Sequence, residues 1–200
     1  MGPLGLGVQG AASATVLAQG ISAGIGLGYI VRYYPELFYI PGLALGTSTA
    51  IYASQNYGAG LGKRIRRGCR TAILLYGIWW IIALMFTFTL APAAIRLLTG
   101  SSNPEVISNG LLYLRVSIPM IPPMAVLVIL RNALQGMQHL KAPLICSTLE
   151  LIGKVIFAIW LVPVWGYIAV CICEPVTWVI CCAFIVGAAV VFRKEFQTAE

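Results

Sequence analysis

The sequence predicts an all-α, polytopic integral membrane protein with about six transmembrane helices. Of its 200 residues, 60% are hydrophobic and only 10% are charged, and the mean hydropathy is +0.90. A soluble domain carries about 25% charged residues, so this chain has too little polar surface to be solvated by water alone. Several of its apolar stretches also reach the roughly 20 residues that a helix needs to cross a bilayer.

Six stretches are long and apolar enough for such helices. They are residues 4–31, 38–57, 71–95, 111–130, 142–162 and 167–192. The first has no positive leader and no small-residue cleavage site, so we expect a retained span and not a signal peptide. The fourth contains Pro119, Pro122 and Pro123. Each proline removes a backbone hydrogen bond, so we expect this helix to be kinked or broken.

The charged residues are distributed unevenly between the ends of these stretches. Thirteen Lys and Arg outnumber six Glu, and there is no Asp. Basic residues follow the second, fourth and sixth stretches, whereas the connections at 99–109 and 162–166 contain neither Lys nor Arg. By the positive-inside rule, we expect the basic side and the carboxyl terminus to be cytoplasmic in the cell (plasma) membrane. This pattern favours a lipid bilayer, and not nucleic acid, as the partner of the positive charge.

Two ionisable residues in the middle of the fifth stretch and one near the inner end of the fourth are candidates for function, because charge within a membrane is costly. Glu150 and Lys154 are four residues apart, which places them on one helix face in the order that favours a salt bridge. They either line a cavity that binds a cation or couples to protons, or form a neutralised structural pair between helices. Arg131 is either a third partner or a side chain that extends to the headgroups.

Glu174 lies about a third of the way into the last stretch, directly before Pro175. Because proline lacks an N–H group, one backbone carbonyl a turn earlier has no helical donor. A carboxylate beside such a carbonyl is a candidate cation or proton site. The alternative is a carboxyl group that burial keeps protonated.

The sequence contains no recognisable motif of an enzyme active site. It contains one histidine, His139, no Asp, and no glycine-rich nucleotide loop. The six cysteines show no metal-type spacing, and most lie in apolar stretches, where cysteine behaves as a small hydrophobe. We therefore expect no catalytic activity, no metal and no cofactor.

Several motifs resemble those of one transporter family. They are QNYGAG at 55–60 with the basic run after it, LRNALQG at 130–136, Pro143, LELIGK at 149–154, and EP-x-x-W at 174–178. In this combination and order, residues 38–192 resemble the carboxyl-terminal part of a MATE (multidrug and toxic compound extrusion) transporter. The motif residues that we expect to be structural are Gln55, Asn56, Gly58, Asn132, Gln135, Gly136, Pro143 and Pro175.

The resemblance implies one lobe of a two-lobed fold. Residues 1–36 resemble the last helix of the amino-terminal lobe, and residues 37–200 an incomplete carboxyl-terminal lobe of about five helices. We therefore expect a truncated and internally deleted member, with a helix missing near residue 37. The acids that bind the coupling ion on helices one, seven and ten of well-studied members have no counterpart here. Glu150 and Glu174 are then the intramembrane acids left for that role.

The function that the resemblance implies is antiport, in which small organic cations and xenobiotics leave the cell in exchange for sodium or protons. A flippase of the same superfamily is one alternative, but only Arg131 and Lys154 could supply the basic cavity that flippases commonly have. The other alternative is a non-transporting membrane protein, or a non-functional fragment. Since one lobe cannot rock against itself, transport would require self-association or a partner lobe.

Overall fold

The computed structural model describes residues 40–100 and 103–197, and all regular structure in this part of the chain is helical. The α-helices are α2 (Ile40–Gly58), α3 (Gly62–Thr89), α4 (Ala91–Thr99), α5 (Pro104–Ser117), α6 (Ile121–Gly136), α7 (Lys141–Ile156), α8 (Val162–Trp165) and α9 (Tyr167–Val191). Three short turns of other helical types are η2 (Ile118–Met120), η3 (Phe157–Leu161) and η4 (Glu195–Gln197). The all-α class expected from the composition is confirmed.

Four helical segments of the described residues are long and apolar enough to cross a membrane. They are Gly62–Thr89, Pro104–Gly136, Lys141–Trp165 and Tyr167–Val191. These segments correspond to the third through sixth expected stretches. The second stretch forms α2, which is not among the four because polar Ser, Gln and Asn residues occupy its last turns. The first stretch, residues 4–31, lies outside the described residues.

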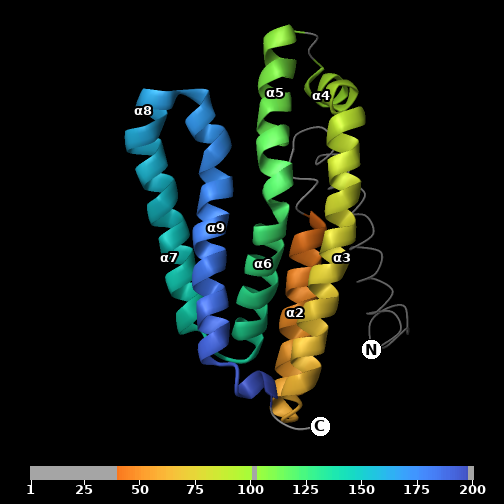
Figure 1. Ribbon diagram of the computed structural model, residues 1–200, viewed down its shortest axis with the longest axis vertical. Helices are drawn as coiled ribbons and strands as arrows, with labels where there is room; N and C mark the ends of the chain where they lie inside the picture. Colours follow the sequence, from red (N-terminus) through yellow and green to blue (C-terminus); the bar gives the residue numbers. More distant parts are fainter. Residues whose placement is uncertain (1–39, 101–102, 198–200) are drawn as a thin grey trace, which may run out of the picture.

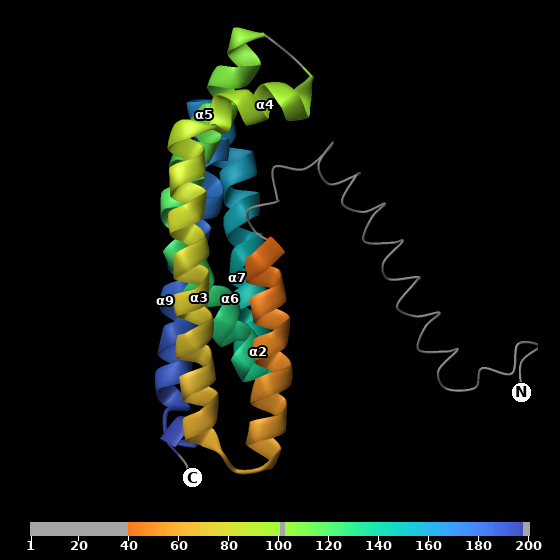
Figure 2. The ribbon, with the colours of Figure 1, turned by 90° about the vertical axis from the view of Figure 1, so that its right-hand side faces the viewer.

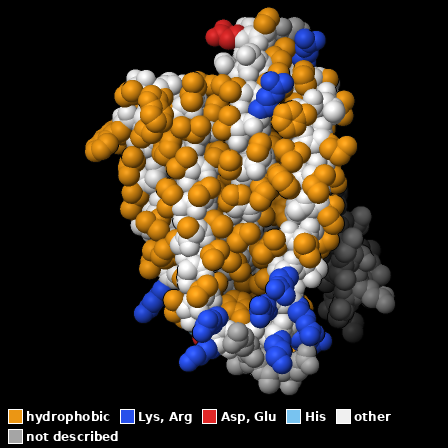
Figure 3. All heavy atoms as spheres, in the orientation of Figure 1, with side chains coloured by type: hydrophobic (Ala, Val, Ile, Leu, Met, Phe, Trp, Pro, Cys, Tyr) orange, Lys and Arg blue, Asp and Glu red, His pale blue; other side chains and the backbone are white. Residues whose placement is uncertain are grey.

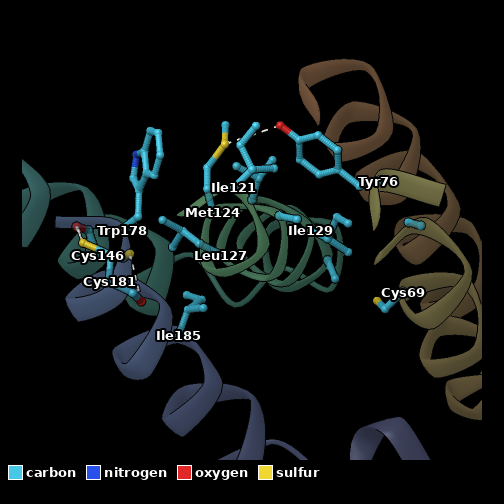
Figure 4. Close-up of a cluster of buried hydrophobic side chains, with 14 of the residues drawn as sticks. Cys69, Tyr76, Ile121, Met124, Leu127, Ile129, Cys146, Trp178, Cys181 and Ile185 are labelled. Atoms are coloured by element: carbon cyan, nitrogen blue, oxygen red, sulfur yellow. Dashed lines mark hydrogen bonds between the residues drawn. The ribbon is translucent and has the colours of Figure 1, made fainter. Parts of the chain in front are cut away.

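The long helices stand side by side, and α6 lies in the middle of them (Figures 1 and 2). It packs against α2 and α3 on one side and against α7 and α9 on the other, as the view along its axis shows (Figure 4). Ile121, Ile129 and Leu134 of α6 are completely buried. Toward α3, the hydroxyl of Tyr76 donates to the sulfur of Met124 over 3.4 Å. The core of the bundle is therefore organised around α6.

The contact between α2 and α6 depends on glycine. A Cβ atom at Gly136 would collide with the carbonyl oxygen of Ala50 and would lie 3.0 Å from the Cβ of Ala53. At Gly46, an added Cβ would lie 2.8 Å from the side-chain nitrogen of Asn132. The two backbones can approach this closely only where there is no side chain, which is the usual arrangement in membrane helix packing.

The fourth stretch is interrupted, as its prolines predicted. The α-helical pattern of α5 gives way to the 3₁₀ turn η2, and α6 begins directly after it. Pro122 has no N–H group to donate to the carbonyl of Ile118. The indole Nε1 of Trp80, on α3, donates to this carbonyl over 3.0 Å. This carbonyl also accepts from the backbone N–H of Ile121, so a 3₁₀ bond and a side chain of a neighbouring helix together take the place of the bond that Pro122 cannot form.

The boundaries expected for the third stretch, residues 71–95, were wrong at both ends. The helix begins at Gly62, so the basic run expected in a loop forms the first turns of α3. It also ends at Thr89, where the chain turns into α4, which runs across the top of α3 (Figure 2). Pro92, at the start of α4, cannot continue the hydrogen-bond ladder of α3, which explains the break.

The close approach at Gly136 leads to a stability prediction. Gly136→Ala should lower the thermal unfolding midpoint of the detergent-solubilised protein, because overpacking at a well-packed contact costs about 1–3 kcal/mol. The matched control is Gly187→Ala on α9, where an added Cβ has no neighbour within 4 Å. Equal midpoints for the two variants would contradict the close contact between α2 and α6.

Candidate functional site

The four ionisable residues singled out in the sequence form one chain of ion pairs. This ion-pair chain consists of Arg131 on α6, Glu150 and Lys154 on α7, and Glu174 on α9. Glu150 accepts from Arg131 Nη1 at 3.3 Å and from Lys154 Nζ at 3.1 Å. Lys154 Nζ also lies 3.0 Å from Glu174 Oε1. Two positive and two negative side chains therefore neutralise one another across three helices.

The pairs arise partly within one helix and partly between helices. Glu150 and Lys154 meet because residues four apart share a face of α7. Glu174 joins them only because α9 packs beside α7. The guanidinium of Arg131 contacts Glu150, which is the arrangement expected if Arg131 is a third partner.

Small side chains hold α7 against α9 next to the ion-pair chain. The thiols of Cys146 and Cys181 lie 3.9 and 3.7 Å from each other's backbone carbonyl oxygens (Figure 4). Both cysteines are completely buried and are free thiols. A Cβ added at Gly153 would make an ordinary van der Waals contact with the hydroxyl of Thr177, at 3.5 Å, so the two helices lie close together there. This packing sets the distance across which Lys154 reaches Glu174.

The ion-pair chain is only partly covered by the described residues. The exposed fractions of its side chains are 26% for Arg131, 25% for Glu150, 40% for Lys154 and 30% for Glu174. Charged groups at membrane depth do not face lipid tails, but face protein or a water-filled cavity. Among the described residues the two carboxylates are also unequal, because Glu150 has two cationic partners and Glu174 has one.

The motif residues occupy both packed and open positions. The amide of Asn56 donates to Tyr52 O over 2.8 Å, and that of Asn132 donates to Val128 O over the same distance. Asn56 is buried, like three other motif residues: Gly136, Pro143 and Pro175. Gln55, Gly58 and Gln135 are exposed. The contacts of the packed residues fit a structural role, and that role stays a prediction for all eight motif residues.

A second cluster, which the sequence analysis did not identify, closes one end of the bundle. His139 Nε2 lies 2.7 Å from Glu195 Oε2, and its ring stacks on that of Phe192 with centroids 4.0 Å apart. The ring of Tyr57 meets His139 edge-on at 6.1 Å, and its hydroxyl donates to Glu195. This His139–Glu195 cluster joins the end of α2, the turn between α6 and α7, and the segment after α9. The bonds from His139 and Tyr57 lower the pKa of Glu195.

Basic side chains gather at this same end, as expected from the sequence (Figure 3). They belong to the start of α3, the start of α7 and the segment after α9. Arg96 and Arg115, which the sequence analysis left out, lie on α4 and α5. Lys and Arg also appear at the opposite end of the molecule (Figure 3). The charge asymmetry is therefore weaker than the connections 99–109 and 162–166 suggested.

Comparison with known proteins gives one match. The family model named MatE matches residues 34–160, which is well over half of the chain. The matched segment contains Arg131, Glu150 and Lys154, and ends before α9 and Glu174. No curated protein and no solved structure matches the chain.

The pair between Lys154 and Glu174 leads to a prediction about stability. Lys154→Met should lower the unfolding midpoint in detergent, because it leaves Glu174 without its cation. In Lys154→Met/Glu174→Gln this penalty should largely disappear, with a coupling of about 1 kcal/mol for a pair that is partly exposed. Additive effects of the two substitutions would show that the side chains do not interact.

The His139–Glu195 cluster leads to a prediction about pH. The pKa of Glu195 is lowered from its ordinary value of 4.5, so its contribution to stability is present above that value. The contribution is lost as the pH falls through the lowered pKa. The unfolding midpoint of the wild type should exceed that of Glu195→Gln at neutral pH, and the difference should close as the pH falls below 4.5. A difference that persists unchanged at lower pH would exclude the carboxylate charge as its cause.

Proposed function

This chain belongs to the MatE family of membrane transporters, and from this premise we propose that it is a secondary active antiporter. It exports small organic cations or xenobiotics in exchange for sodium or protons. The observation that supports this function is the ion-pair chain, which brings two partly exposed carboxylates and two cations together across α6, α7 and α9.

Glu174 is the carboxylate that changes partners in this proposal. In the described part of the chain it has one cationic partner, whereas Glu150 is held by both Arg131 and Lys154. When a proton or sodium ion binds Glu174, the ammonium group of Lys154 keeps Glu150 as its counter-ion. An organic cation that binds Glu174 replaces Lys154 in the same way. Since the two ligands compete for one carboxylate, only one of them is bound at a time, and competition of this kind produces exchange.

A second lobe completes the transport pathway in this proposal. It is supplied by another copy of the chain or by a partner, and it covers the exposed side of the ion-pair chain. Alternating access then follows from the rocking of the two lobes around the shared site. The bundle lies in the plasma membrane with its basic end in the cytoplasm. A flippase is less well supported, because Arg131 and Lys154 are both paired with carboxylates and not free to bind an anionic headgroup.

Ethidium efflux from proteoliposomes that carry this chain tests the proposal. Sodium and proton gradients are imposed separately, which identifies the coupling ion. Glu174→Gln should slow gradient-driven efflux about tenfold or more, corresponding to a loss of roughly 1.4 kcal/mol. Glu150→Gln should also slow efflux, because it removes the carboxylate that pairs with both Arg131 and Lys154. Glu105→Gln, an exposed carboxylate at the start of α5, is the matched control and should retain wild-type efflux.

Two outcomes would contradict the proposal. If efflux does not exceed that of empty liposomes although the protein is in the membrane, the chain is a non-transporting member of the family. If efflux is normal in Glu174→Gln, a group other than Glu174 carries the coupling.

A further inference from the structure

An open groove of about 350 Å³ runs between α3 and α9 at the basic end of the bundle. It is separate from the ion-pair chain and shares no residue with it. Its walls are formed by residues of both helices, by one residue of α6 and by the segment after α9. The residues that line it are Arg66, Cys69, Arg70, Ile73, Leu130, Val186, Ala189, Val190, Arg193 and Phe196.

The α3–α9 groove is charged at one end and apolar along its length. Arg66 and Arg70 are four residues apart, so they share a face in the first turns of α3, and Ile73 continues that face inward. Helix α9 runs in the opposite direction, so Arg193, just beyond its last turn, reaches the same end as the two arginines of α3 (Figure 1). Toward the middle of the bundle, the walls are aliphatic. Phe196 and Cys69 are buried at the charged end.

The three arginines have no carboxylate partner among the described residues. Glu195 is two residues from Arg193, but its oxygens are engaged by His139 and Tyr57. Three guanidinium groups at one end of a groove repel one another, and an anion placed between them would relieve this repulsion. Guanidinium groups bind phosphate oxygens in a bidentate geometry, which makes a phosphate group the best match.

We propose that the α3–α9 groove binds an anionic phospholipid. Its phosphate lies among Arg66, Arg70 and Arg193, and one acyl chain follows the aliphatic walls past Ile73 and Val186. A lipid fits this site better than a free phosphate ion, because most of the groove is apolar and opens on helices long enough to span a membrane. Basic pockets between transmembrane helices at the membrane surface are suited to anionic headgroups. The bound lipid links α3 to α9, the two helices on opposite sides of α6.

Lipid titration of the full-length chain in detergent micelles tests this site. Phosphatidylglycerol and phosphatidylcholine are added separately, and retained lipid is counted by native mass spectrometry. Phosphatidylglycerol should bind with one tight stoichiometric site, and phosphatidylcholine should not. Arg66→Gln/Arg70→Gln should weaken this site about thirtyfold, because each cation near the headgroups contributes a factor of about five. Lys63→Gln/Arg64→Gln removes the same charge from the same helix outside the groove, and should weaken it less than about threefold.

A third variant tests whether binding requires the groove itself in addition to the positive charge. Ala189→Phe leaves all arginines in place but fills the aliphatic part, so it should also remove the tight site. Equal weakening in the two double variants would overturn the proposal, because attraction would then come from the diffuse basic surface. Tight binding that persists in Ala189→Phe would also overturn it. So would inorganic phosphate displacing the lipid at equal concentration, since the site would then recognise a free anion.

Discussion

Close packing around α6 is the constraint on which the rest of this bundle depends. Every other long helix that carries a candidate functional residue is positioned by its contact with α6. Gly136 brings α2 close, Met124 receives the hydroxyl of Tyr76 from α3, and the guanidinium of Arg131 reaches α7. Because protein interiors are packed as densely as crystals, a shift of α6 would change all of these contacts together. The ion-pair chain is therefore a product of helix packing as much as of its own charges.

Charged side chains are paired differently in two parts of the structure, within the spans and at the basic end of the bundle. Within the spans, Arg131, Glu150, Lys154 and Glu174 balance one another, which limits the cost of placing four charges at membrane depth. At the basic end, His139 and Tyr57 form hydrogen bonds with Glu195, while the arginines of the α3–α9 groove have no acidic partner in the described part of the chain. The first arrangement leaves the four side chains with no net charge, whereas the second leaves a net positive charge.

Prolines and glycines determine where the helices bend and how near they approach. The break between α5 and α6 follows from Pro119 and Pro122, and the indole of Trp80 donates to the carbonyl of Ile118, to which Pro122 cannot donate. The end of α3 follows from Pro92 in the same way. These residues are recognisable in the sequence, but the group that compensates for each lost bond is not, because Trp80 is far from Ile118 along the chain.

Hydropathy and the local spacing of charged residues allowed several features of this protein to be predicted from its sequence alone. The all-α membrane class, the broken fourth stretch, the family motifs and the pairing of Glu150 with Lys154 all depend on residues within a few helical turns, so they could be read directly. Only the tertiary structure decided that Arg131 and Glu174 join that pair, that His139 meets Glu195, and that Arg193 lines the same groove as Arg66 and Arg70. Each of these arrangements joins residues from different segments of the chain. Their distances are set by helix packing, which depends on side-chain volume over the whole bundle and leaves no local pattern in the sequence.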